Sequence, residues 1–317
     1  MVTGGSGFLG GALVRELLSR GHAVRVLDNH SRGRPERLAD LPEVELMVGD
    51  LRDAAAVREA TSGVDFLWHL GAVNGTRNFY ERPDEVIEVG IAGALHTVQA
   101  AIDAGVSRYI FASSSEVYHQ PEVVPTPERV PAVVPDMHNA RYSYAGSKIA
   151  GELLALHLCR RRGVEAVIVR PHNVYGPAMG EDHVVPQLIR KLGERLLDGP
   201  RVRLPIEGDG SQTRAFCYVD DAARGVAVSG LHGIDGGIYN VGREDEISIR
   251  ELALRLGSLL NLEVEIVPGE RPAGGTLRRC PDVSALRALG WSPRVSLREG
   301  LERTLNAYLA RDVSSSG

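Results

Sequence analysis

Short apolar runs alternate with longer segments of helical periodicity through the first 170 residues of the chain. The runs are rich in β-branched and aliphatic residues and predict strands at residues 24–28, 44–48, 66–70, 109–113 and 166–170. Apolar residues at helical spacing predict helices at residues 8–20, 53–60, 84–104 and 142–162. Strands that alternate with helices pair in parallel through right-handed crossovers, and continuously apolar strands need cover on both faces. The pattern therefore predicts an α/β fold built on a doubly wound parallel sheet.

The alternation weakens after residue 170, where loops rich in glycine and proline separate isolated helical segments. These helices are predicted at residues 184–197, 249–260 and 297–309. We therefore expect a smaller, irregular C-terminal domain. The boundaries that we predict are residues 1–174 for the first domain, with 213–242 returning to it, and residues 175–212 and 243–317 for the second.

A glycine-rich segment, TGGSGFLG at residues 3–10, stands directly before the first predicted helix. Gly4, Gly7 and Gly10 have the spacing that allows a tight turn, close approach of backbone to a pyrophosphate, and close packing of helix on sheet. The helix N-terminus then offers free N–H groups to the phosphates. Because only Val2 and Thr3 precede these glycines, we expect the numbered chain to begin inside the first strand, with native residues missing before it.

Asp28 ends the second predicted strand, about 20 residues beyond the glycines, where a carboxylate binds the adenosine ribose hydroxyls. Glycine triplets alone are weak evidence, but the strand, the helix and Asp28 together predict a dinucleotide-binding Rossmann domain. A carboxylate at this place repels a 2′-phosphate and favours NAD. Arg32 and Arg34 lie nearby and keep NADP open as an alternative.

Tyr144 and Lys148 are four residues apart at the start of a predicted helix and therefore share one face. A cation beside a phenol lowers its pKa, so Tyr144 is a candidate base for a substrate hydroxyl. The chain holds only two lysines, Lys148 and Lys191, so this placement is informative, although a surface pair has the same spacing. Ser113, Ser114 and Ser115 follow a predicted strand at the carboxyl edge of the sheet, where ligands bind.

At these motifs the chain resembles the extended short-chain dehydrogenases/reductases that act on nucleotide sugars. Residues 3–10 are similar to the family's TGGxGFxG loop, 144–148 to its YxxxK, and 113–118 to its SSSxxVY segment. Residues 170–177 are similar to its RxxNxYGP run, 208–221 to its GDGxQxRDFxYVDD segment, and 278–291 to its C-terminal R…D…LGW region. The motifs are specific for the family and leave the reaction open.

The resemblance implies NAD as cofactor, a nucleotide-diphosphate sugar as substrate, and roles for particular residues. The catalytic group would be Ser114, Tyr144, Lys148 and Glu116. The cofactor-binding group would be Gly4, Gly7, Phe8, Leu9, Gly10, Asp28, Asn29, Asp50, Leu51, Leu70, Ala72, Tyr144, Lys148 and Pro171. The substrate-binding group would be Arg77, Ser115, Asn173, Arg214 and Arg278.

The implied first step is oxidation at sugar C4, after which several reactions are possible. We favour a 4-epimerase, because a dehydratase that uses Glu116 as its acid and base commonly carries an Asp before it, where this chain has Ser115. A 4,6- or 5,6-dehydratase, a UDP-glucuronate decarboxylase and a simple NAD(P)-dependent oxidoreductase remain alternatives. A regulatory protein that only senses NAD is the alternative outside catalysis, and the intact Tyr144 and Lys148 argue against it.

The composition indicates which partners and which cellular compartment to expect. The formal net charge of −5 argues against a basic surface for nucleic acid, and no apolar run approaches the roughly 18 residues of a membrane span. The three cysteines are odd in number and far apart, which argues against a disulfide framework or a metal site and favours the cytoplasm. The helices predicted at residues 84–104 and 142–162 carry apolar residues on more than one side, and relatives pair through them, so we expect a homodimer.

Overall fold

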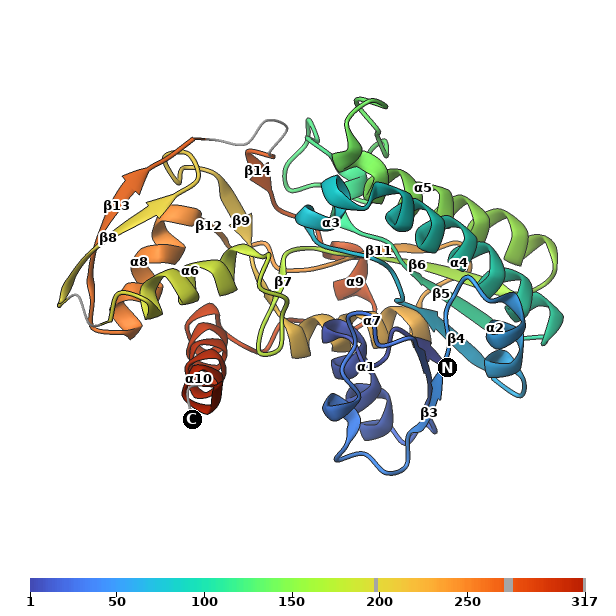
Figure 1. The fold of residues 1–317 in the computed structure, drawn as a ribbon. Coiled ribbons are helices and arrows are strands. Elements are labelled where there is room, and N and C mark those ends of the chain that lie inside the picture. The colour runs from blue at the N-terminus through green and yellow to red at the C-terminus, as the bar shows by residue number, and fades with distance from the viewer. Residues whose placement is uncertain (197–198, 271–275, 316–317) are drawn as a thin grey trace.

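A seven-stranded parallel sheet forms the centre of the molecule in the computed structural model, which describes residues 1–196, 199–270 and 276–315 (Figure 1). The strands, in their order across the sheet, are β11 (Ile238–Val241), β6 (Glu165–Pro171), β5 (Arg108–Ala112), β4 (Phe66–His69), β1 (Val2–Thr3), β2 (Arg25–Asp28) and β3 (Glu45–Val48). Strand order reverses between β1 and β4, as in doubly wound folds. The predicted fold class is confirmed, and the predicted strands agree with the observed ones to within a residue or two at their ends.

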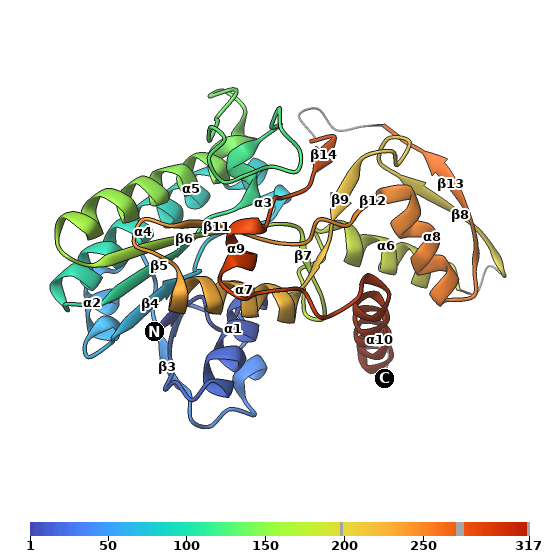
Figure 2. The same ribbon diagram turned by 180° about the vertical axis from the view of Figure 1, so that it is seen from behind.

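Helices cover both faces of this sheet, and each face has its own apolar core (Figures 1 and 2). The helices α2 (Ala54–Thr61), α4 (Pro83–Asp103) and α5 (Ser143–Leu154) lie on one face, and α1 (Phe8–Ser19) and α7 (Val219–His232) lie on the other. The helix predicted at residues 142–162 is confirmed to within a residue at each end, and it is interrupted at Ala155–Cys159 by a wider π-helical turn before it ends at Arg161. Both faces are therefore buried, as the apolar strands require.

Helix α4 is the one described helix that is long and apolar enough, by length and composition, to cross a membrane, with a mean hydropathy of 1.2. We expected no membrane span because the chain has no uninterrupted apolar run of that length. Helix α4 nevertheless meets the criterion of mean hydropathy, because its polar residues are spread along it. Half of the tested window is buried inside the protein, where α4 packs beside α5 and α2. A single helix of this kind is weak evidence, because a core helix passes the same test.

The second part of the molecule is built from short strands and helices around a separate apolar core. Its helices are α6 (Val184–Gly193), α8 (Ile249–Leu259) and α10 (Leu297–Ser315). Its strands form a parallel pair, β8 (Arg201–Ile206) with β13 (Glu263–Pro268), and a three-stranded sheet of β12 (Glu246–Ser248), β9 (Thr213–Ala215) and β14 (Arg278–Arg279). Leu197, the last residue of the helix predicted at 184–197, lies outside the described residues.

The remaining elements are short. They are the short helices α3 (Thr76–Glu81) and α9 (Ser284–Ala288), the 3-10 turns η1 (Pro35–Leu38), η2 (Ser115–Tyr118) and η3 (Ala140–Tyr142), and the two-residue strands β7 (Val174–Tyr175) and β10 (Cys217–Tyr218). β7 and β10 pair with each other beyond the carboxyl end of the main sheet.

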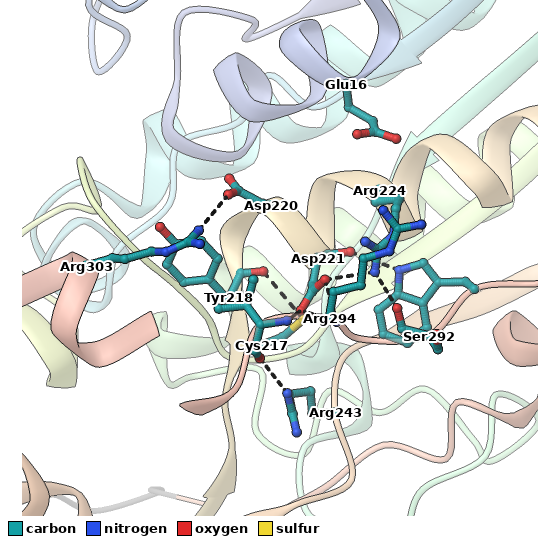
Figure 3. Close-up of polar contacts among 12 residues, drawn as sticks. Glu16, Cys217, Tyr218, Asp220, Asp221, Arg224, Arg243, Ser292, Arg294 and Arg303 are labelled. Atoms are coloured by element: carbon teal, nitrogen blue, oxygen red, sulfur yellow. Dashed lines mark hydrogen bonds and ion pairs between the residues drawn. The ribbon is translucent and has the colours of Figure 1, made fainter. Parts of the chain in front are cut away.

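A buried carboxylate at the start of α7 anchors the chain segment that returns from the sheet to α10 (Figure 3). Asp221 accepts hydrogen bonds from the backbone N–H groups of Arg294 and Val295, at 2.8 to 2.9 Å, and from the Arg224 guanidinium at 2.8 Å. Arg224 also donates to the carbonyl of Ser292. A fully satisfied buried carboxylate of this kind fixes where the second part of the molecule joins the first.

Candidate active site

A pocket of about 610 Å³ opens at the carboxyl ends of the sheet strands and is closed on its other side by the second part of the molecule. Every residue that we assigned to cofactor binding lines it, namely Gly4, Gly7, Phe8, Leu9, Gly10, Asp28, Asn29, Asp50, Leu51, Leu70, Ala72, Tyr144, Lys148 and Pro171. Ser114, Ser115, Glu116 and Asn173 line it as well. Residues from distant parts of the sequence therefore meet in one cavity of ligand size.

The glycine loop has the backbone geometry of a phosphate cradle. Gly4 has a φ of +69°, which favours glycine, and a Cβ built on Gly10 would lie 2.0 Å from the carbonyl oxygen of Gly4. Helix α1 begins at Phe8, and its N-cap residue Gly7 offers no side chain to the first N–H groups of the helix. These N–H groups and the helix dipole are therefore available to an anion.

Asp28 stands at the end of β2 on the floor of the same pocket. Its buried carboxylate accepts hydrogen bonds from the backbone N–H groups of Ser6, at 3.0 Å, and His30, at 2.8 Å. The two bonds orient the carboxylate beside the glycine loop, as binding of a ribose diol requires. Arg32 and Arg34, which we considered as ligands for a 2′-phosphate, also line the pocket, and Arg32 donates to the carbonyl of Asn74.

Tyr144, Ser114 and Lys148 lie together at the inner end of the pocket. The Ser114 side chain lies near enough to the Tyr144 hydroxyl to lower the pKa of the phenol against the effect of burial. Lys148 lies with its Nζ 5.5 Å from the centre of the Tyr144 ring, and this ammonium donates to the carbonyl of Ala112 at 2.7 Å. Tyr144 and Lys148 are both buried. The structure thus brings the predicted phenol, hydroxyl and ammonium into one cluster.

Our expectation that Lys148 brings the pKa of Tyr144 toward neutrality is wrong for this pocket. Burial raises the pKa of Tyr144 above its usual value, and the Glu116 carboxylate raises it further, whereas the interaction with the Ser114 side chain acts against them. The Lys148 ammonium donates to the Ala112 carbonyl, and burial is the largest influence on the pKa of Tyr144. Burial also lowers the pKa of Lys148 to about 8.

Glu116 is held by arginines rather than exposed as a free acid. Arg279 donates to its Oε1 at 2.7 Å, and the Arg141 guanidinium lies 3.8 Å from its Oε2. Burial alone would raise the pKa of Glu116, but Arg279, Arg141 and Arg214 together lower it to about 2. Glu116 is therefore a carboxylate across the physiological pH range.

Arg279 is the residue of this pocket that the sequence reasoning missed, because it assigned the role to its neighbour Arg278. Successive side chains of a strand point to opposite faces, and β14 directs Arg278 away from the pocket, where it pairs with Glu246 at 2.7 Å. Arg279 points inward and lines the pocket beside Glu116. The only feature of the sequence that could have indicated Arg279 is that it directly follows Arg278.

The other two arginines predicted to bind substrate do not line the pocket either. Arg214 is half-buried and donates to the carbonyls of Thr213 and Thr276, each at 2.7 Å. Burial, and then Arg279, lower its pKa to about 10, so it remains a cation. Arg77 is exposed and pairs with Glu81 at 2.8 Å.

The segment that contains Arg77 still contributes to the site. It forms helix α3, and the buried ring of Phe79 stacks on the ring of Tyr144 at a centroid distance of 4.9 Å and an interplanar angle of 14°. The stack fixes the plane of the phenol, which is a role for an apolar residue in a segment where we had looked for polar contacts.

Fold and pocket together define a dinucleotide-binding α/β enzyme of the extended short-chain type. The chain matches the NAD dependent epimerase/dehydratase family over residues 1–242, and it belongs to that family.

Characterised relatives that span nearly the whole chain catalyse different reactions. A UDP-N-acetyl-alpha-D-glucosaminuronate decarboxylase of Bacillus cytotoxicus is 33% identical over 97% of both chains. A UDP-glucose 4-epimerase of Mycolicibacterium smegmatis is 32% identical, again over 97% of both. The structure of a double mutant of a dTDP-glucose 4,6-dehydratase from Streptomyces venezuelae, with NAD bound, has a TM-score of 0.86 and 31% identity and covers 99% of this chain and 97% of that one.

The cofactor of this enzyme is NAD. The pocket fits it, because the glycine cradle and the uncapped start of α1 suit a pyrophosphate and Asp28 suits a ribose diol. Among the described residues, no cluster of His, Cys, Asp and Glu side chains could hold a metal ion.

Proposed function

We propose that the chain is a nucleotide-sugar 4-epimerase that acts through a transient 4-keto sugar. One observation carries this choice within the family, namely that Glu116, which lines the pocket beside Ser114 and Ser115, is paired with Arg279 at 2.7 Å and lies 3.8 Å from Arg141. Ion pairing of this kind disfavours the protonated form that a general acid must reach during each cycle. A dehydratase needs such a group at C5 and an acid for the leaving hydroxyl, whereas an epimerase needs neither.

The residues of the chain divide the work at C4. Tyr144 accepts the proton of the 4-hydroxyl, Ser114 orients the sugar oxygen through its hydroxyl, and Lys148 keeps a positive charge beside the phenol. Bound NAD would supply the acceptor and donor of the C4 hydride, and Tyr144 would return its proton to the 4-keto oxygen when the hydride is delivered to the opposite face of C4. Asn173 and Arg279 line the pocket, and in this proposal they hold the substrate while the keto sugar rotates between the two hydride transfers.

Decarboxylation of a nucleotide-sugar uronate is the second candidate, and a specific observation favours it. The Arg279 guanidinium has further N–H donors beyond the bond to Glu116 and can bind a uronate carboxylate. The decarboxylase of Bacillus cytotoxicus, 33% identical, is named for a uronate substrate. A 4-keto uronate is a β-keto acid, which loses CO₂ without an added acid or base.

Incubation with UDP-, GDP-, ADP- and dTDP-sugars, neutral and uronic, separates these reactions by mass spectrometry and NMR. We expect a product of unchanged mass with inverted C4 and no deuterium from D₂O at C5. Loss of water, or deuterium at C5, would establish a dehydratase instead, and loss of CO₂ from a uronate would establish the decarboxylase. Sustained release of reduced cofactor would identify a net oxidoreductase.

We also propose that the enzyme works as a homodimer paired through α4 and α5. These helices lie side by side and expose Ile87 and Ile91 on α4, at 44% and 38%, and Leu153 on α5, at 54%. Exposed apolar residues on two adjacent helices suit an isologous contact with a second copy. Light scattering at micromolar concentration tests this, and a monomeric mass would refute it.

A further inference from the structure

A buried ion pair lies directly behind the reacting groups. Arg170 on β6 donates from Nη2 to Oε2 of Glu152 at 2.6 Å and from Nε to Oε1 at 2.8 Å, and both side chains are buried. Removing two charges from water costs free energy that their attraction often only balances, so such a pair is weak evidence for a gain in stability. Its two-bond geometry instead fixes the direction of both side chains.

This pair holds both ends of the turn that follows β5. The hydroxyl of Ser113, at the start of the turn, donates to Glu152 Oε1 at 2.5 Å. At the other end, Arg170 Nη1 donates to the Tyr118 hydroxyl at 2.8 Å, and the guanidinium lies 4.8 Å from the centre of the Tyr118 ring. The turn between these two points carries Ser114.

Glu152 also belongs to the helix that carries the other reacting groups. In α5, Tyr144, Lys148 and Glu152 are spaced four residues apart and share one face. We infer that the Glu152–Arg170 pair is a positioning unit of the active site, which locks the Ser113–Tyr118 turn against helix α5 and so fixes Ser114 relative to Tyr144. The inference rests on the proposed function for the roles of Ser114 and Tyr144.

The same pair has an electrostatic effect at Lys148. Tyr144 and Glu152 face its ammonium from α5, and His69 faces it from β4. Burial, followed by the charge of Lys148, lowers the pKa of His69 to about 3, so this ring is neutral at working pH. Burial lowers the pKa of Lys148, and Glu152 opposes that effect. Loss of Glu152 therefore lowers the pKa of Lys148 further, and the alkaline limb of the kcat profile moves to lower pH.

The double substitution Glu152→Met with Arg170→Met tests the inference without leaving an unpaired buried charge. We expect NAD binding to persist and kcat to fall roughly 10²-fold. Arg224→Met is the matched control, because it removes a buried arginine from Asp221, away from the pocket (Figure 3). It should lower the melting temperature and leave kcat and its pH profile unchanged.

Hydrogen exchange gives a readout that does not depend on turnover. Backbone amides of residues 113–118 should exchange faster in the double variant than in the wild type, and those of the Arg224→Met protein should not. Ser113→Ala is a milder variant that should give the same acceleration if the double variant does not fold. Unchanged exchange at 113–118 in the folded variants, or unchanged kcat, overturns the inference. Absence of wild-type turnover on every nucleotide sugar overturns the proposed function instead, and the exchange comparison still decides the positioning role.

Discussion

Replacing Tyr144 by Phe is the sharpest test of the proposed chemistry, because the structure allows loss of the hydroxyl with little disturbance of the fold. The Tyr144 ring is 7% exposed and stacks on Phe79, and a phenyl ring keeps that contact. The substitution removes the interaction of this hydroxyl with the Ser114 side chain. Even a complete hydrogen bond contributes only about 0.5–1.5 kcal/mol to the free energy of unfolding, so the variant should fold.

The expected effect on turnover is much larger than the effect on stability. Loss of a general base costs about 10²–10⁴ in rate, which corresponds to about 3–5 kcal/mol of activation free energy. NAD binding should persist, because the glycine loop and Asp28 are unchanged. The fall should therefore appear in kcat and not in the NAD content of the purified protein.

Tyr239→Phe is the matched control for this experiment. Tyr239 is also buried, and its hydroxyl accepts one hydrogen bond, from the N–H of Ile234 at 3.0 Å, at a place outside the pocket. It should change stability by a similar amount and leave kcat unchanged. Near-normal turnover in Tyr144→Phe, measured by NMR on the productive sugar, would refute the reasoning. An equal loss of turnover in Tyr239→Phe would attribute the effect to folding.

Three further substitutions test the remaining parts of the site. Gly10→Ala places a methyl group 2.0 Å from the Gly4 carbonyl, so the purified variant should lose its bound NAD, measured by cofactor release on denaturation. Glu116→Gln removes the anion that faces Arg279, and an epimerase should lose far less activity than in Tyr144→Phe, whereas accumulation of reduced cofactor with substrate would establish a dehydratase. Between pH 8 and 10.5 the folded enzyme holds fewer protons on Lys148 than the unfolded chain does, so the free energy of unfolding should rise with pH. Measured against Lys148→Met, the rise over this range should be about 3 kcal/mol. A difference between the two proteins that does not change with pH would contradict this.

The part of the fold that could be read from the sequence is the part where periodicity is unambiguous. Inner strands of the main sheet such as β5 and β6 are buried on both faces and so appear as continuous apolar runs, and the helices between the strands are long enough to show their period. The second part offers neither signal. β9, β12 and β14 are two or three residues long, and their pairing joins segments more than 30 residues apart. Such strands exist because of tertiary contacts, which the local pattern does not encode.

The same contrast explains why the cofactor residues could be assigned and the substrate arginines could not. Backbone motifs such as the glycine loop specify their own geometry, so each assigned cofactor residue lines the pocket. A side chain on an isolated two-residue strand points to one face or the other according to the pairing of that strand, and a shift of one residue reverses it. β14 pairs with β9 so that Arg279 lies opposite Arg214, which turns Arg279 toward Glu116 and Arg278 toward Glu246. The pairing of β14 with β9 therefore decides which arginine faces Glu116 and keeps it charged. The sequence predicts least about this end of the pocket, and it is here that an epimerase and a decarboxylase would differ.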